Sequence, residues 1–360
     1  MITISLCMIV KNEEAILGRC LDSIREAVDE IIIVDTGSTD NTRKVARKYT
    51  EKIYDFEWVD DFSSARNFAY SKATMDYQMW MDADDVLPES QLAKLLRLKN
   101  TITPDIDIVT MKYLTHFDEQ GKPTLISTRE RLTKREKGYK WIDPVHECIP
   151  LIGNIFYSDI EIEHRKPKDA LVNSARNLNI YKKYEAGGKT FTPRQLYYYA
   201  RELKDHGQWP QAAAFFEKFL ETKEGWFEDN IASCFNLAIC YSQMGEEEKV
   251  LPILLRSFMF DAPRAEICSE IGYYYKRAKN YLSAFKWFRL AANLGKPESI
   301  GFVLQDYWGY IPNIECCVCL CELGEFAEAK IYNERAAKFK NTAATEINRK
   351  YLESKPGLAV

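Results

Sequence analysis

The sequence lacks the features that mark several large classes of protein. No stretch of its 360 residues approaches the roughly 20 consecutive apolar residues that span a bilayer. The first apolar run, ITISLCMIV, ends in Lys-Asn-Glu-Glu and is followed by no cleavage site, so we expect a strand here and no signal peptide. A net charge of −4 gives no electrostatic attraction to nucleic acid or to an anionic membrane. We therefore expect a cytoplasmic protein that needs neither nucleic acid nor membrane insertion.

The two common glycine-rich phosphate-binding motifs are also missing. No G-x-G-x-x-G follows the first apolar run, and no G-x-x-x-x-G-K-[ST] occurs anywhere in the chain. In proteins that have these motifs, backbone amides hold the phosphates of the nucleotide. A nucleotide bound by this chain therefore needs a cation for its phosphates.

The ten cysteines do not form the pattern of a zinc site. They are scattered, except for a cluster that contains one C-x-x-C spacing but has no second pair and no histidine nearby to complete four zinc ligands. The cluster comprises Cys316, Cys317, Cys319 and Cys321. We interpret it as small core residues of a helix.

Short apolar runs alternate with helical spacing over the first part of the chain. The runs lie at residues 2–10, 31–34, 53–56 and 77–81, and the second is continuously apolar. A continuously apolar run fits a strand that is buried on both faces, as in a parallel sheet. The spacing between the runs predicts intervening helices, the first of which has Asn12 as a candidate cap.

Polar residues stand where three of these strands end. Asn12, Asp35 and Asp82 each follow an apolar run. In an open α/β sheet, ligands bind outside the carboxyl ends of the strands. The three side chains are therefore expected to converge on one crevice.

The run YQMWMDADDVL ends in Asp82, Asp84 and Asp85. Three carboxylates in four residues repel one another unless a cation or several donors neutralise them, which is typical of a metal-diphosphate site. Alternatively, the acidic cluster opens a helix, because Pro88 and Glu89 follow and carboxylates favour a helix N-terminus.

Four motifs, CMIVKNEE, IIIVDTGSTDNT, DFSSARN and MDADD, occur in that order within about the first 90 residues. Together they resemble the family 2 inverting glycosyltransferases of the GT-A fold, and four ordered motifs are far more specific than one. The resemblance implies an α/β GT-A domain, a nucleotide-diphospho-sugar transferase with a mostly parallel sheet.

The resemblance also implies roles for residues in these motifs. Asn12, Glu13, Asp35, Arg66 and Asp82 are expected to bind the donor. Asp35 would contact the uracil or ribose of a nucleotide-sugar, and Asp82 the ribose or the metal. Arg66 would lie near the base or phosphates, where a guanidinium offers a planar fork, although a solvent-facing helix position is its ordinary alternative.

The expected cofactor is a divalent cation, Mn²⁺ or Mg²⁺, which hard oxygen ligands favour. By the same resemblance its ligands are Asp82, Asp84 and His164; a lone histidine is otherwise often a structural residue. The weaker candidate is His146. Basic residues that either close over the diphosphate or form a solvated face are Lys166, Lys168 and Arg176.

Two alternating segments around the turn EQGKP predict an antiparallel pair of strands, and KGYKWIDPVHECI follows. Inverting transfer needs a carboxylate that takes the proton of the acceptor. Glu147 is the first candidate for this base and Asp143 the second, and a structural hydrogen bond is the alternative for each.

From about residue 192 the sequence becomes helical and repetitive. Four turn positions recur, with small or compact residues five after and seven before each: Gly207, Gly245, Lys279 and Gly324. This pattern resembles tetratricopeptide (TPR) repeats of about 34 residues, with an insertion within residues 293–311. Independent helical hairpins with chance alanines are the alternative.

We therefore predict a GT-A domain over residues 1–165, a helical connector over 166–191, an all-α TPR superhelix over 192–350 and a tail over 351–360. The predicted reaction moves a hexose or N-acetylhexosamine, with UDP as the first choice of nucleotide, to a protein or peptide acceptor held by the repeats. Two alternatives remain: a polysaccharide or lipid-linked acceptor with repeats used for oligomerisation, and an inactive scaffold. A homodimer through the repeats fits either kind of acceptor.

Overall fold

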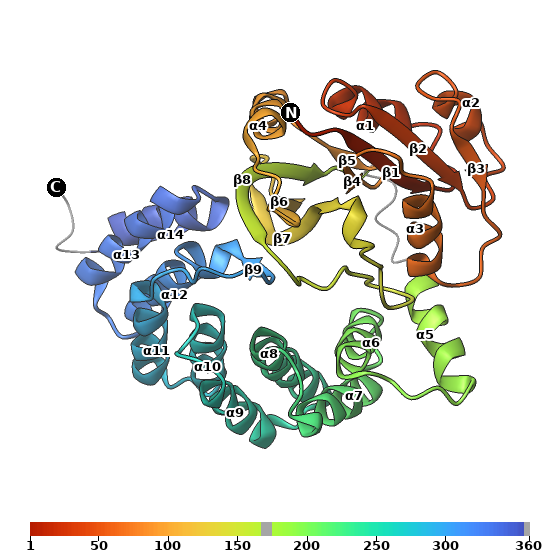
Figure 1. Ribbon diagram of the computed structural model, residues 1–360. Helices are drawn as coiled ribbons and strands as arrows, with labels where there is room; N and C mark the ends of the chain where they lie inside the picture. Colours follow the sequence, from red (N-terminus) through yellow and green to blue (C-terminus); the bar gives the residue numbers. More distant parts are fainter. Residues whose placement is uncertain (167–174, 356–360) are drawn as a thin grey trace. The chain divides into compact units, whose positions relative to one another are not determined.

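The computed structural model describes residues 1–166 and 175–355, which form two units (Figure 1). The first unit comprises Met1–Lys189 together with Ser299–Val303 and is built on a β-sheet. The second comprises Thr190–Glu298 and the residues from Leu304 onward, and it is largely helical.

The sheet of the first unit has the strand order β3-β2-β1-β4-β7-β6-β8-β5. Its first four strands in this order are mutually parallel: β3 (Ile53–Asp55), β2 (Glu30–Asp35), β1 (Ile4–Val10) and β4 (Tyr77–Trp80). The remaining strands are β7 (Pro123–Lys134), β6 (Ile108–Phe117), β8 (Ile155–His164) and β5 (Asp85–Val86). β6 and β7 form the predicted antiparallel pair, and β8 lies parallel to β6. The short strand β9 (Val303–Leu304) also pairs with β7.

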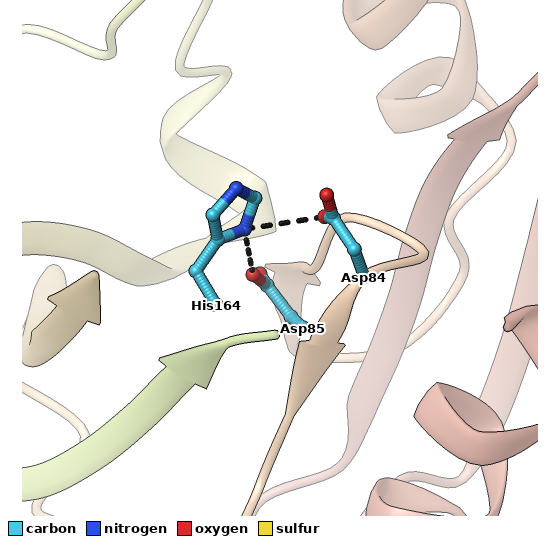
Figure 2. Close-up of side chains that lie close together, drawn as sticks. All are labelled: Asp84, Asp85 and His164. Carbon is cyan, nitrogen blue, oxygen red and sulfur yellow. Dashed lines mark hydrogen bonds and ion pairs between the residues drawn. The ribbon is translucent and has the colours of Figure 1, made fainter. Parts of the chain in front are cut away.

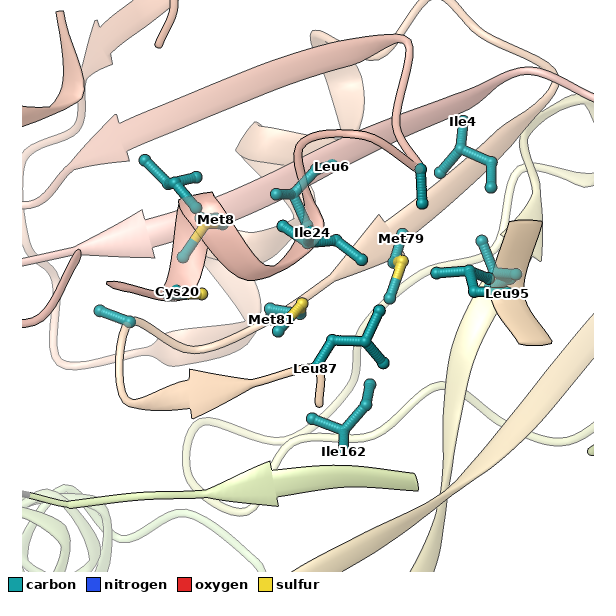
Figure 3. Packing of buried hydrophobic residues seen from close by; sticks show 14 of the residues in the cluster. Ile4, Leu6, Met8, Cys20, Ile24, Met79, Met81, Leu87, Leu95 and Ile162 are labelled. Atoms are coloured by element: carbon teal, nitrogen blue, oxygen red, sulfur yellow. The ribbon is translucent and has the colours of Figure 1, made fainter. Parts of the chain in front are cut away.

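Alternate residues of the parallel strands enter two different cores, because successive side chains of a strand point to opposite faces. On one face, Leu6 and Met8 pack with α1 (Leu17–Ile24) and α4 (Glu89–Thr101), as Figure 3 shows for the labelled residues. On the other face, Cys7 packs with residues of α3 (Phe62–Ser71). The continuously apolar pattern of the sequence therefore reflects burial on both faces of the sheet.

The strand register brings the carboxyl ends of the parallel strands to one edge. Val10 pairs with Asp35, and Asp35 with Asp55, so β1, β2 and β3 end together. Asp82 and Asp84 lie in the turn between β4 and β5, Asp85 begins β5, and α4 begins only at Glu89, with Pro88 before it. The acidic residues are therefore not the start of a helix.

Asn12 does not cap α1, contrary to the expectation, because that helix begins at Leu17 with Ile16 as its cap. Asn12 instead has a left-handed backbone, with φ of 58°. Its Oδ1 accepts a hydrogen bond of 2.8 Å from the Thr39 amide, and its own amide donates to the Ser38 hydroxyl at 3.0 Å. Asn12 thus ties the loop after β1 to the loop before α2 (Thr42–Ala46).

One further helix, α5 (Arg176–Ala186), belongs to the first unit. The Tyr181 hydroxyl donates to the Val145 carbonyl at 3.3 Å, and the Lys183 ammonium lies 2.6 Å from the carboxylate of Asp60. These contacts connect α5 to the segment that precedes β8 and to the loop that precedes α3.

The second unit is a series of helices in which each helix packs mainly on the next in the chain. They are α6 (Pro193–Asp205), α7 (Trp209–Thr222), α8 (Phe227–Met244), α9 (Glu247–Arg256), α10 (Ala265–Arg277), α11 (Tyr281–Asn293), α12 (Tyr310–Glu322), α13 (Phe326–Phe339) and α14 (Ala343–Glu353). The four predicted turn residues all have left-handed backbones, including the non-glycine Lys279 at φ of 57°. The inserted residues lie where predicted, between α11 and α12, and those at 299–303 join the first unit.

The small residues of the repeat pattern are buried between helices. Ala200, Ala238 and Cys317 are at most 3% exposed. Gly272 is required by close approach, because a Cβ there would lie 2.8 Å from a ring carbon of Phe288. The second unit is therefore the predicted TPR array, and Cys316, Cys317 and Cys319 are core residues of α12.

Within the described ranges, no helix is both long enough and apolar enough to cross a membrane.

Glu30, at the start of β2, supplies a prediction about pH. Its buried carboxylate accepts hydrogen bonds from the Ser5 hydroxyl, the Lys52 ammonium, and the amide and hydroxyl of Thr74. Burial by itself raises the pKa of Glu30, but these partners lower it from its usual value of 4.5 to about 2. A lowered carboxyl pKa stabilises the fold above the unfolded pKa, and this stabilisation is lost as the pH falls through the folded pKa.

We therefore expect Glu30→Gln to lower the free energy of unfolding by about 2–3 kcal/mol near neutral pH. The variant should also lose less stability than the wild type between pH 4.5 and pH 2. Urea unfolding at a series of pH values measures both effects. Glu136→Gln, in an exposed pair with Lys134, is the matched control. An identical pH dependence in wild type and Glu30→Gln contradicts the assignment.

Candidate active site

A cavity of about 350 Å³ lies where the parallel strands of the first unit end. This volume is at the lower end of the range found for small-molecule sites. Six predicted site residues line it: Glu13, Arg66, Asp82, Asp84, Glu147 and His164. Asn12, Asp35 and Asp143 do not belong to this lining.

Asp84, Asp85 and His164 form a group that is able to hold a metal ion (Figure 2). The Nδ1 atom of His164 lies 3.2 Å from Oδ1 of Asp84 and 3.2 Å from Oδ1 of Asp85, and one ligand atom from each residue lies within 4.8 Å of the others. Strand pairing creates this group, because β5 runs antiparallel to β8 with Asp85 opposite His164. Carboxylate oxygens with one imidazole suit Mn²⁺ or Mg²⁺.

Asp85 has a structural role that the sequence did not reveal. It is fully buried, and its Oδ2 accepts a hydrogen bond of 2.9 Å from Nη1 of Arg131, which is also fully buried. Its Oδ1 accepts one of 2.8 Å from the Tyr113 hydroxyl, which also lies 2.6 Å from Nδ1 of His164. A buried carboxylate that is paired with arginine is already compensated, whereas Asp84 has the His164 imidazole as its partner, so Asp84 is the better carboxylate for a cation.

Arg131 and Tyr113 were missed because both belong to alternating segments that predicted only strands. The guanidinium carbon of Arg131 lies 3.7 Å from the ring centre of Trp80. One feature of the sequence could have indicated Arg131: it occupies a position of a strand that faces the core. An arginine is almost never fully buried unless it is paired, so an arginine at such a position predicts a buried carboxylate as its partner.

Asp82 lies outside the metal group and is paired with Arg66. Its Oδ1 accepts a hydrogen bond of 2.7 Å from Nη2 of Arg66. Burial raises the pKa of Asp82, but the Arg66 guanidinium outweighs this effect and lowers the pKa to about 2. The role of Asp82 as a metal ligand stays a prediction.

Arg66 connects Asp82 to the candidate base. Its Nε donates to Oε1 of Glu147 at 2.6 Å, and its guanidinium carbon lies 4.8 Å from the ring centre of Trp80 and 4.9 Å from that of Trp141. Arg66 is therefore buried and does not face solvent. Arg66 lines the cavity. Its Nη1 is buried and has no hydrogen-bond partner among the described residues.

Asp35 holds the turn after β2. Its Oδ1 accepts hydrogen bonds from the amides of Gly37 at 3.2 Å and Ser38 at 2.9 Å, and only 2% of its side chain is exposed. The neighbouring Thr36 lines the cavity. Contact between Asp35 and a nucleotide stays a prediction.

Glu13 lies close to the carboxylates of the acidic cluster. Burial, together with the carboxylates of Asp84 and Asp82, raises the pKa of Glu13 to about 7. Negative charge concentrated in this way favours a bound cation.

Other predicted residues reach the same cavity. Lys166 and Arg176 line it, whereas Lys168 lies outside the described residues. The guanidinium carbon of Arg176 is 4.6 Å from the ring centre of Phe62. His146 also lines the cavity but does not belong to the metal group, and its backbone φ is 54°.

Residues 5–157 match the family model described as glycosyl transferase family 2. The first unit therefore contains a family 2 glycosyltransferase domain of the GT-A fold, as the four motifs predicted. The chain combines this domain with carboxyl-terminal TPR repeats.

Three curated proteins illustrate what the chain is similar to. A TPR repeat-containing protein of Synechococcus elongatus is 47% identical over 87 residues, which cover 24% of this chain and 22% of that protein. The SPbeta prophage-derived glycosyltransferase SunS of Bacillus subtilis is 26% identical over 221 residues, 61% of this chain and 49% of that protein. The lipopolysaccharide core biosynthesis glycosyltransferase LpsC of Rhizobium meliloti is 29% identical over 160 residues, 42% of this chain and 58% of that protein. The chain thus spans less than two thirds of the length of each of these relatives.

Proposed function

We propose that the first unit transfers a sugar from a nucleotide-sugar to an acceptor, with inversion at the anomeric carbon and dependence on a divalent cation. The observation that carries this proposal is one cavity shared by the metal group (Asp84, Asp85 and His164) and the linked residues Asp82, Arg66 and Glu147. The donor is a UDP-linked hexose or N-acetylhexosamine.

Asp84 and His164 would hold the cation. Asp85 would contribute a lone pair of its carboxylate that is not used by Arg131 or Tyr113. Burial and the nearby carboxylates of Asp84 and Asp82 raise the pKa of Glu13, and this closeness of carboxylates supports a cation here. When bound, Mn²⁺ or Mg²⁺ offsets the negative charge that develops on the departing diphosphate.

Arg66, Lys166 and Arg176 supply the positive charge of the protein itself. All three residues line the cavity. Guanidinium groups bind phosphate oxygens with defined geometry, so these residues would orient the donor as well as attract it.

Glu147 is the base in this proposal. It lies in the cavity wall but outside the metal group, so it is available to accept the proton of an acceptor hydroxyl or thiol that attacks the anomeric carbon. Asp143, the second candidate, belongs to the same segment but not to the cavity lining.

The acceptor is a protein or peptide held by the TPR repeats, because stacked helix pairs present an extended surface for such ligands. The similarity to LpsC favours a second candidate, a polysaccharide or lipid-linked acceptor, with the repeats used for oligomerisation. Two measurements on the purified protein discriminate between these acceptors. Binding of candidate peptides supports the first, and an oligomer in sedimentation without peptide binding supports the second. The cytoplasmic location and the homodimer stay predictions.

A donor-hydrolysis screen tests the proposed function. Purified protein is incubated with UDP-, GDP- and TDP-sugars, with and without Mn²⁺ or Mg²⁺, and nucleotide release is measured. We expect release from one class of donor only when the cation is present. We expect Glu147→Gln to lower the rate about 10²- to 10⁴-fold, because the amide is unable to accept the proton.

The control variant is Glu136→Gln, which changes an exposed glutamate of the same unit and should leave the rate unchanged. The proposal is wrong if no donor releases its nucleotide and no nucleotide binds in a cation-dependent way. Full activity of Glu147→Gln would transfer the base role to another carboxylate.

A further inference from the structure

The segment that carries Glu147 has little regular structure of its own. Residues 138–154 contain only an isolated bridge, in which Ile142 and Cys148 exchange amide-to-carbonyl hydrogen bonds of 3.0 and 3.2 Å. Within this bridge, Asp143 and His146 have left-handed backbones, with φ of 74° and 54°. Such conformations are costly for non-glycine residues and persist only when surrounding groups impose them. The position of Glu147 therefore depends on contacts from outside the segment.

Helix α3 supplies three of these contacts, besides those that come from β7 and α5. The Phe62 amide donates to the Pro144 carbonyl at 2.9 Å, and Arg66 binds the carboxylate of Glu147. The third contact is made by Asn67, whose Nδ2 donates to the Trp141 carbonyl at 2.9 Å while its Oδ1 accepts from the Trp141 amide at 2.9 Å. Asn67 thus binds Trp141 in both directions, as a neighbouring strand would.

Trp141 also contacts other residues of the site. It is buried, its ring centre lies 5.3 Å from that of Trp80, and the Arg66 guanidinium carbon is 4.9 Å above its ring. The same residue therefore belongs to the segment that carries Glu147 and also packs against Arg66. A shift of Trp141 would move both the candidate base and the guanidinium that holds it.

We propose that Asn67 is a positioning residue for the candidate base: its amide fixes the backbone of Trp141 and so places Glu147 and Arg66 together in the cavity. This inference rests on the proposed function for its kinetic consequence, but the fixing of the segment is independent of it. Misplacement of a reacting group by about 1 Å is enough to cost about 10²-fold in rate.

The structural part is tested by hydrogen exchange of the peptide over residues 140–149. In Asn67→Ala we expect about tenfold faster exchange in this peptide, as two hydrogen bonds are lost, and unchanged exchange in peptides from β1 and β2. Asn100→Ala is the matched control, because within the described part of the chain its side-chain amide bonds only within its own helix, to the Leu96 carbonyl at 2.9 Å. Unchanged exchange over 140–149 in Asn67→Ala overturns the proposal whether or not the enzyme is active.

The kinetic part is tested by cation-dependent donor turnover. Asn67→Ala should lower kcat about 10- to 100-fold and change the KM of the donor less than about twofold. Asn67→Asp is the second variant: it keeps the acceptor for the Trp141 amide but directs an oxygen at the Trp141 carbonyl, so kcat should fall in the same way. A larger KM with unchanged kcat contradicts positioning of the base.

A double-variant cycle separates positioning from a general loss of structure. In a Glu147→Gln background, Asn67→Ala should cause a much smaller further loss of kcat than in the wild type, because the base that it positions is already gone and only the placement of Arg66 remains to be disturbed. The same fold-loss in both backgrounds overturns the proposal. Absence of turnover in the wild type defeats the proposed function instead, and hydrogen exchange then decides the role of Asn67 alone.

Discussion

Asp84→Asn should lower cation-dependent nucleotide release about 10²- to 10³-fold. Asp84 is the member of the metal group whose carboxylate is not paired with a buried arginine, so its charge is the one available to a divalent cation. The amide keeps the size of the side chain but removes that charge, and a Lewis acid contributes several kcal/mol to stabilising the leaving group. Steady-state rates over a range of Mn²⁺ concentrations measure the effect.

Asp159→Asn is the matched control for this variant. Asp159 lies on β8 like His164, but its side chain is 74% exposed and pairs with Lys94 at the surface. It should retain the wild-type rate and cation dependence. A wild-type response of Asp84→Asn to Mn²⁺ would show that this group is not the catalytic metal site.

Arg131→Met should lower the free energy of unfolding of the first unit by about 3–5 kcal/mol. Both side chains of the Arg131–Asp85 pair are fully buried. Removal of one partner leaves an uncompensated charge in the interior, which costs far more than the loss of an exposed pair. Urea unfolding followed by hydrogen exchange of peptides from β1 and β7 reports this unit separately from the TPR array.

The double variant Arg131→Met with Asp85→Asn provides the decisive comparison. A neutral amide at position 85 needs no counter-charge, so the double variant should regain much of the stability lost in Arg131→Met. Lys94→Met breaks an exposed pair and should cost only about 0–1 kcal/mol. Equal losses in Arg131→Met and Lys94→Met would refute a charge-compensating role for Arg131.

Features that depend on neighbours in the chain were predictable from the sequence. The apolar runs gave the strands that carry the site, since burial on both faces of a sheet requires continuous apolar residues. The repeat positions also followed from local needs: Lys279 lies in a left-handed turn, and Gly272 packs against Phe288. The cap assigned to Asn12 was wrong, because its side chain bonds to the next loop and not to the following helix.

By itself, the sequence determined the glycosyltransferase motifs, the first four strands with the helices between them, the antiparallel pair β6 and β7, and the TPR array that follows. Only the tertiary structure decided which charged side chains contact one another. The register of β5 on β8 places His164 against Asp85, and the packing of Trp141 brings Glu147 to Arg66. These pairings join residues that are far apart in the chain, and hydrophobic spacing determines which face a residue lies on but not its partner across the sheet. For this reason the sequence identified Asp82, Asp84 and His164 as candidates, while the roles of Asp85, Arg131 and Asn67 emerged only from the fold.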